Sequence, residues 1–266
     1  MELASAVVRA RGAESEIHRA RSAGALRLMF PRTSPTAAWV VTSNLGGGLV
    51  RGDAQRLELD VGAEARCLLT TQGSTKVYRG SSRFELAARI GSGGALLAVP
   101  DPISLYRGAR LEQRTELTLE PDANLLFVEV FTAGRVAHGE RWDLAGLDAR
   151  LVLKTPDRTF FRDRLLLDPA HGGVAERMRS FDALGTVVAL GPAFTELTAN
   201  WLADRTPARA DRGRGLQGPV LASSPVAGGA IVRLASPTIS QAIDATRALA
   251  SAACAVFDED PFARKG

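Results

Sequence analysis

Apolar and polar positions alternate along most of the chain, and this alternation predicts a protein built mainly from β-strands. In residues 55–61, apolar side chains take every second position and charged side chains lie between them, as a half-buried strand requires. The same pattern predicts strands at residues 15–20, 25–30, 39–42, 64–70, 84–90, 95–99, 111–119, 124–131, 141–148, 150–154, 159–167, 186–190, 220–222 and 229–235. Short turns separate these segments, which favours stacked sheets over alternating strands and helices.

Two segments near the C-terminus have the periodicity of helices instead. Residues 193–204 place apolar side chains at every third or fourth position and form one apolar stripe. Residues 237–257 do the same, with Ser236 as the expected N-terminal cap and Pro237 at the first helical position. The segment between the helices, residues 204–219, is rich in Arg, Gly and Pro and is predicted to be a loop.

We find no sequence repeat with a period of about 20–50 residues and no linker that would divide the chain. Residues 1–266 are therefore expected to form a single β-rich domain. A chain of this length can bury a sizeable core without metals or disulfides.

Consecutive glycines at Gly46–Gly48, with another at Gly52, have part of the spacing of a phosphate-binding loop. Asp53, however, takes the place of the lysine that such a loop needs, and a strand follows where a helix is required. A carboxylate repels phosphate, so the glycines indicate tight turns within a sheet and not a nucleotide site. The tripeptide Arg-Gly-Asp at residues 51–53 is short enough to occur by chance.

The composition is that of an ordinary globular protein, with 45% hydrophobic and 23% charged residues. The net charge is +4, but acidic and basic residues are intermingled, except in the arginine-rich residues 205–214. Cys67 and Cys254 lie in apolar segments and are expected to be buried thiols. The sequence shows no secretory signal and no apolar run of about 20 residues, so a cytoplasmic protein without a membrane partner is expected.

Metal ligands are scarce, because the chain has three His and two Cys and none of them form a closely spaced pair. The available donors are carboxylates, namely Asp53, Glu129, Glu140 and Asp143, with His138 as a further candidate. Carboxylates bind a divalent transition metal more weakly than imidazole or thiolate does. We therefore expect no strong metal site and no tightly bound cofactor. These carboxylates can also serve simply as partners of Arg135 or Lys76 in ion pairs.

Two further alternatives concern the polar segment at residues 70–79, which contains Ser74, Lys76 and Tyr78. The segment can brace a turn against neighbouring strands, or it can form the polar wall of a channel. A hydrolase would recruit Ser74 with His138, but the nucleophile-elbow pattern GxSxG is absent. A catalytic constellation is therefore not expected.

Four separated motifs carry a resemblance to a known family. They are GGGLVRGD at residues 46–53, TTQGSTKVYR at 70–79, VPDPISLYRGARLEQRTELTL at 99–119 and GRVAHGERW at 134–142. In this order they resemble the UreD/UreH family of urease accessory proteins. Arg51 is a departure, because the family pattern has a small residue there.

The resemblance implies a mainly β fold of stacked sheets in a helical-type arrangement, with two α-helices near the C-terminus. It implies a non-enzymatic maturation factor that binds apo-urease and joins the UreF and UreG accessory proteins. That assembly supports nickel delivery and carbamylation of the active-site lysine of urease. Nickel is then a transient cargo and no nucleic acid is expected to bind.

Two site hypotheses follow from the resemblance. The first is a polar passage lined by Asp53, Glu129 and Glu140, in which Lys76 and Arg135 hold the carboxylates in place. The second is that the C-terminal helix binds the UreF-type partner through an apolar stripe, which consists of Ile239, Ile243, Leu249 and Phe257. The alternative function is a β-rich binding module for another protein or for nucleic acid, with residues 205–214 as its basic patch. Sparse aromatic residues disfavour the stacking of single-stranded bases.

Overall fold

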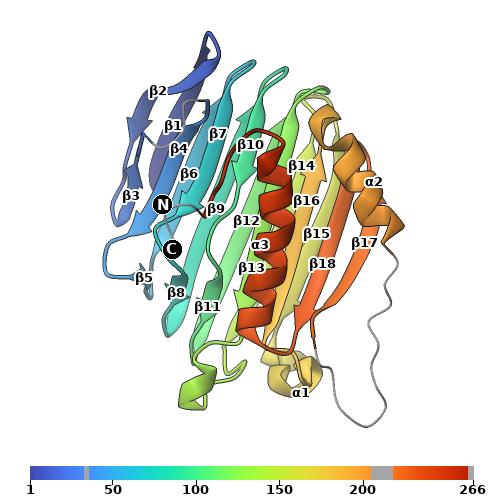
Figure 1. The fold of residues 1–266 in the computed structure, drawn as a ribbon. Helices are drawn as coiled ribbons and strands as arrows, with labels where there is room; N and C mark the ends of the chain where they lie inside the picture. The colour runs from blue at the N-terminus through green and yellow to red at the C-terminus, as the bar shows by residue number, and fades with distance from the viewer. Residues whose placement is uncertain (33–35, 205–217, 263–266) are drawn as a thin grey trace.

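Two large β-sheets face each other, and helices cover the outer side of one of them (Figure 1). The structure is a computed structural model and describes residues 1–32, 36–204 and 218–262. Sheet 1 has the strand order β15 (Thr159–Leu167), β14 (Gly146–Lys154), β12 (Ala109–Leu119), β9 (Gly80–Ile90), β6 (Ala54–Val61), β1 (Glu2–Arg11) and β2 (Glu14–Arg21). Sheet 2 has the order β17 (Val220–Val226), β18 (Gly229–Ser236), β16 (Ala183–Leu190), β13 (Asn124–Thr132), β10 (Ala95–Ala98), β7 (Arg66–Thr71), β4 (Ala38–Asn44) and β3 (Leu26–Met29). The predicted mainly β fold of stacked sheets is confirmed.

The middle of the chain winds as a coil that alternates between the sheets. It passes from β6 to β7, from β9 to β10 and from β12 to β13, so neighbouring strands of each sheet are parallel. The successive coils are in register. Arg56 pairs with Glu85 and Arg83 pairs with Glu112, and in both pairs the two residues are 29 positions apart in the sequence. Between the sheets, the short strands β5 (Gly48–Leu49), β8 (Thr75–Val77) and β11 (Ile103–Leu105) form a narrow third face.

This coil corrects the expectation that the chain contains no repeat. The strands need only an apolar inner face, which many sequences satisfy, so identity between coils is low. One feature does recur at the corner of each coil, where residues 50–52, 78–80 and 106–108 read Val-Arg-Gly, Tyr-Arg-Gly and Tyr-Arg-Gly.

The main core lies between the sheets and follows the predicted alternation. In β6 every second residue is buried, and Leu57, Leu59 and Val61 join the core cluster. The outer face of sheet 1 instead carries ion pairs between neighbouring strands, such as Arg56–Glu85 and Arg83–Glu112. That face is therefore open to solvent.

A second core lies on the outer side of sheet 2, under α2 (Thr195–Ala203) and α3 (Ile239–Ala255). Both predicted C-terminal helices are present. The expected cap of the second helix is wrong, because the Thr238 hydroxyl accepts the hydrogen bond from the Gln241 N–H while Ser236 ends β18. A further short helix, α1 (Val174–Met178), was not predicted.

Several strand predictions differ from the structure. β13 pairs with β10 and β16, and residues 141–145 of the strand predicted at 141–148 belong to a loop. β1 was not predicted. Residues 205–217, which contain most of the predicted loop and the arginine-rich patch, lie outside the described residues. Among the residues that are described, no helix is long and apolar enough to cross a membrane.

Candidate functional site

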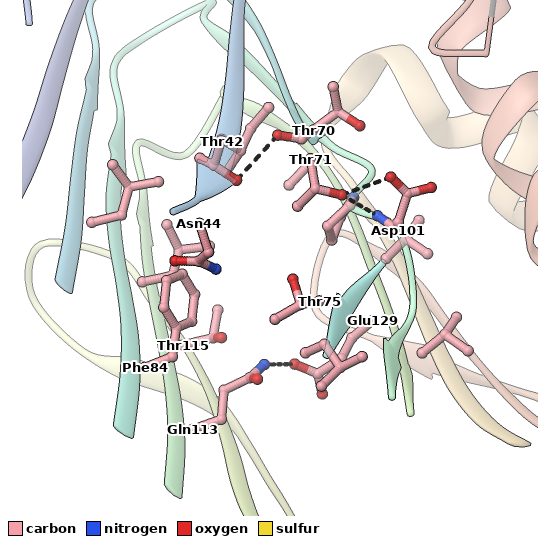
Figure 2. Close-up of a pocket in the computed structure, with 18 of the residues that line it drawn as sticks. Thr42, Asn44, Thr70, Thr71, Thr75, Phe84, Asp101, Gln113, Thr115 and Glu129 are labelled. Atoms are coloured by element: carbon pink, nitrogen blue, oxygen red, sulfur yellow. Dashed lines mark hydrogen bonds between the residues drawn. The ribbon is translucent and has the colours of Figure 1, made fainter. Parts of the chain in front are cut away.

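A cavity of about 80 Å³ lies between the two sheets, and we call it the central cavity. Its walls are mostly apolar, with Leu57 and Phe84 among the residues from sheet 1. Its polar side chains come from both sheets and include Thr42, Asn44, Thr71, Thr75, Gln113 and Glu129 (Figure 2). A polar lining inside a sandwich core is unusual, because buried polar groups require partners. The cavity is therefore a candidate functional site.

Two larger cavities adjoin the central cavity. A vestibule of about 510 Å³ is lined by Gly47, Gly48 and Lys76 and shares Thr71 and Thr75 with the central cavity. An edge cavity of about 360 Å³ lies between β13, β16 and β18 of sheet 2 and β14 and β15 of sheet 1. It shares Glu129 with the central cavity. The shared lining residues thus place the three cavities next to one another, and we call this series the line of cavities, with Glu129 where the central and edge cavities meet.

Glu129 is the charged residue of β13 and its one half-buried position, while the other residues of the strand are buried. It projects from β13 toward sheet 1, where the Gln113 Nε2 of β12 donates a hydrogen bond to its Oε1 (Figure 2). Burial raises the pKa of Glu129 to about 8, and the nearby Asp163 carboxylate adds to this, while the bond from Gln113 opposes it. The side chain is therefore mainly neutral at pH 7.

Unpartnered acceptors surround this junction. Gln113 is 5% exposed, and its Oε1 has no hydrogen-bond partner among the described residues. The Asn44 Oδ1 on the vestibule side is likewise buried without a described partner. Buried acceptors normally receive a hydrogen bond or contact a cation. The line of cavities therefore offers oxygen atoms to a small polar or cationic guest.

The edge cavity contains an ion pair that joins the two sheets. The Arg233 Nη2 of β18 lies 2.8 Å from the Asp163 Oδ2 of β15. Sequence reasoning missed Asp163, Arg233 and Gln113. Arg233 and Asp163 are 70 residues apart, and Gln113 and Glu129 are 16 residues apart on different sheets, so neither pair leaves a local pattern.

Glu140 does not line any of the three cavities. It is 6% exposed and forms a two-pronged ion pair with Arg135, in which the Arg135 Nε lies 3.0 Å from the Glu140 Oε2. The Arg135 bond lowers the pKa of Glu140. The ion-pair alternative is therefore the one that the structure supports for this carboxylate.

Asp53 and His138 also lie away from the cavity line. The Asp53 Oδ2 accepts a hydrogen bond of 2.9 Å from the Val50 N–H, and the side chain faces a separate groove beside Arg83 and Glu112. His138 is exposed on a short 3₁₀ turn. The structure thus places Glu129 and Lys76 on the line and separates them from the other predicted residues. In the described ranges, no three His, Cys, Asp or Glu side chains come together as metal ligands.

The family-model comparison decides the relationship of the chain. A model described as the UreD urease accessory protein matches residues 3–265. The chain belongs to the UreD urease accessory protein family. The resemblance found from the four motifs is therefore confirmed.

Curated relatives within the UreD family agree. The chain is 40% identical over 252 residues to the urease accessory protein UreD of Sorangium cellulosum, covering 94% of this chain and 79% of the relative. It is 38% identical over 245 residues to the UreD protein of Anaeromyxobacter sp., covering 90% and 81%. Urease accessory protein D of Arabidopsis thaliana is 35% identical over 182 residues, covering 65% and 62%. All of these relatives carry the names of accessory proteins and not of catalysts.

The apolar stripe of α3 in this UreD family member packs largely against its own sheet. Phe257 is 8% exposed, and its ring centroid lies 5.6 Å from that of Phe194. Ile239, Ile243 and Leu249 are half-buried. Phe257 is thus occupied within the chain, and partner binding by the other three residues remains a prediction.

Proposed function

We propose that this chain is a non-catalytic scaffold in urease maturation, which binds apo-urease together with UreF-type and UreG-type proteins and guides nickel toward the urease active site. Membership of the UreD family supports the maturation role. The observation that carries the nickel path is the position of Glu129, which borders both the central and the edge cavity. An ion that moves along the line of cavities has to pass this side chain.

The donor chemistry of the cavities suits a cargo better than a resident ion. Threonine hydroxyls, amide oxygens and the carboxylates of Asp101, Glu129 and Asp163 bind nickel weakly, whereas imidazole and thiolate ligands would retain it. Conduction requires a site that releases an ion as readily as it accepts it. Glu129 is mainly neutral without cargo, so an arriving cation displaces a proton and gains a ligand at the same atom.

The proposed function is tested by co-expressing the chain with urease subunits and the UreF-type and UreG-type proteins. We expect the chain to co-purify with apo-urease and its partners, and urease without it to contain little nickel. Urease that is fully nickel-loaded when the chain is omitted would refute the maturation role.

The partner helix needs a gentler test than deletion, because removing α3 uncovers the core around Phe194 and Trp201. Ile239→Ser and Ile243→Ser change half-buried positions and leave Phe257 in place. We expect these two variants to reduce co-purification with the UreF-type protein, whereas Asp244→Ser at an exposed position of the same helix should not. If all three variants co-purify with as much UreF-type protein as the wild-type chain does, α3 does not bind this partner.

A further inference from the structure

Three arginines occupy the same corner position in three successive coils. Arg51, Arg79 and Arg107 follow β5, β8 and β11, which pair side by side on the narrow third face (Figure 1). Hydrogen bonds fix the register, because the Tyr78 N–H donates to the Leu49 carbonyl at 2.9 Å, and the Tyr106 N–H donates to the Val77 carbonyl at 3.0 Å. We call these three side chains the arginine column.

The glycine after each arginine makes room for the column. A Cβ at Gly80 would lie 2.6 Å from the Arg51 Cβ, and a Cβ at Gly108 would lie 3.1 Å from the Arg79 Cγ. Each arginine stem therefore lies over the glycine of the next coil. Gly80 and Gly108 also have φ angles of +111° and +69°, which other residues rarely adopt. The repeated Arg-Gly pair is thus the sequence signature of the column.

Two aromatic residues, Tyr78 and Tyr106, directly precede Arg79 and Arg107 in the sequence. The rings of Tyr78 and Tyr106 meet edge to face with their centroids 5.5 Å apart. The guanidinium of Arg135 lies 4.8 Å from the centroid of the Tyr106 ring. Tyr and Arg are the residues most enriched where proteins bind one another, because they offer a large contact area together with hydrogen-bond donors.

The column is short of internal counter-charges. Arg107 pairs with Asp143 at 2.5 Å and Arg135 pairs with Glu140, but Arg51 and Arg79 form no ion pair with any described residue. Both are exposed. Arg56 and Arg83, on the outer face of sheet 1, do have carboxylate partners. The fold therefore presents at this corner two arginines, Arg51 and Arg79, whose positive charge no described acid neutralises in an ion pair.

We propose that the arginine column, flanked by Tyr78 and Tyr106, is a docking site for an acidic segment of a partner protein. This inference rests on the proposed function insofar as that partner belongs to the maturation assembly. Neighbouring strands lie about 4.8 Å apart, so the column repeats at about that distance. Carboxylates three and four residues apart on a helix are spaced by about 5–6 Å, which matches it. The favoured occupant is therefore an acidic helix.

The test measures binding to the immobilised full chain and to Arg79→Glu, with Arg89→Glu as the matched control. Arg89 is exposed near the far end of β9, ten residues from Arg79, and has no ion-pair partner among the described residues. The probes are apo-urease, the UreF-type protein, a helical peptide with glutamates three and four positions apart, and a single-stranded oligonucleotide. Each is measured at about 50 and 200 mM NaCl, because contacts between exposed charges weaken with salt. Arg51→Ser serves as a second column variant.

We expect the acidic peptide and at least one of the proteins to bind the wild-type chain and to bind less tightly at the higher salt. Arg79→Glu should weaken that binding by more than about tenfold, since like charges placed opposite each other cost several kcal/mol, and Arg89→Glu should change it less than about twofold. The inference is overturned if Arg79→Glu and Arg51→Ser bind every probe as the wild-type chain does, if nothing binds the wild type, or if the oligonucleotide binds tighter than the peptide. If neither protein binds but the peptide does, the result contradicts the proposed function and still supports the arginine column as a binding site for an acidic helix.

Discussion

Glu129 is the residue in which the folding and the proposed function of the chain meet. Its strand packs into the core, yet its carboxyl group lies where two cavities join. A carboxyl group in such a place is destabilising when charged. Its presence in the core therefore calls for a functional reason, and passage of a cation supplies one.

The raised pKa of Glu129 predicts how stability depends on pH. The group titrates near 8 in the folded chain instead of its ordinary 4.5, so the folded state holds a proton that the unfolded state has released. Stability is therefore lost as pH rises from about 4.5 through about 8. Glu129→Gln removes this loss. In urea unfolding, the variant should match the wild type near pH 5 and exceed it near pH 9 by on the order of 2 kcal/mol. An equal difference at both pH values would contradict the assignment, and Glu116→Gln on the exposed face is the control.

Gly80 predicts a second effect at the residue scale. Gly80→Ala places a Cβ against the Arg51 side chain and also strains a backbone with positive φ. Gly52→Ala causes the backbone strain alone, because no atom lies within 4 Å of a Cβ at that position. Gly80→Ala should therefore lower the free energy of unfolding more than Gly52→Ala does, by roughly 1–3 kcal/mol. Thermal unfolding of the two variants measures this, and equal losses would mean that the column is not packed on its glycines.

Individual site residues were only partly predictable. Lys76 lies in a family-like motif and lines a cavity, whereas Glu140 lies in such a motif but pairs with Arg135, and Glu129 lines two cavities although it lies outside the four motifs. The sequence does not separate these cases, because a carboxylate carries no local mark that tells whether it faces an arginine or a cavity. Gln113 gave no signal, as one polar residue on an inward face looks like an interruption of the pattern.

At the scale of elements, α3 and the segment after it close the second core. Phe257 packs against Phe194, and Arg66 lies 5.4 Å from the centroid of the Phe257 ring. The Trp39 Nε1 donates a hydrogen bond of 3.1 Å to the buried Glu259 carboxylate. The C-terminal segment thus ties the helix to β4.

Phe257→Ala should therefore destabilise the whole fold. Removing a buried phenylalanine typically costs about 3–5 kcal/mol, whereas Val256→Ala at a neighbouring position that is 45% exposed should change stability by less than about 0.5 kcal/mol. Urea unfolding monitored by tryptophan fluorescence compares the two. A loss below about 1 kcal/mol for Phe257→Ala would show that α3 is only loosely attached.

The strands themselves were predictable, but their partners were not. The alternation in β6 follows from local sequence, since each apolar side chain needs the same buried face. The pairing of β13 with β10 and β16 instead depends on contacts across whole coils, and the loop at residues 133–145 looks no different from a hairpin turn. The Arg-Gly pairs were the available signal for the coil, and they become recognisable as a repeat only when compared at the coil spacing.

At the scale of the molecule, the coil performs two tasks with one geometry. Its interior leaves the line of cavities from the vestibule through Glu129 to the edge cavity, and its corner displays the arginine column. A rigid stack of parallel strands holds both in fixed relation, because each strand is hydrogen-bonded to the next. The two proposed roles, docking of a partner and guidance of an ion, both rely on this geometry.

The most direct test of the cavity path is the nickel bound per urease active site after maturation with Glu129→Ala, compared with the wild-type chain and with Glu116→Ala in complexes of equal composition. Glu116 lies on the outer face of sheet 1 in an ion pair with Lys154, far from the cavity lining. We predict that Glu129→Ala lowers the nickel content below about half of the wild-type level while the complex still assembles, because the passing ion loses its ligand at the junction. Full nickel loading by Glu129→Ala in an intact complex would contradict the account.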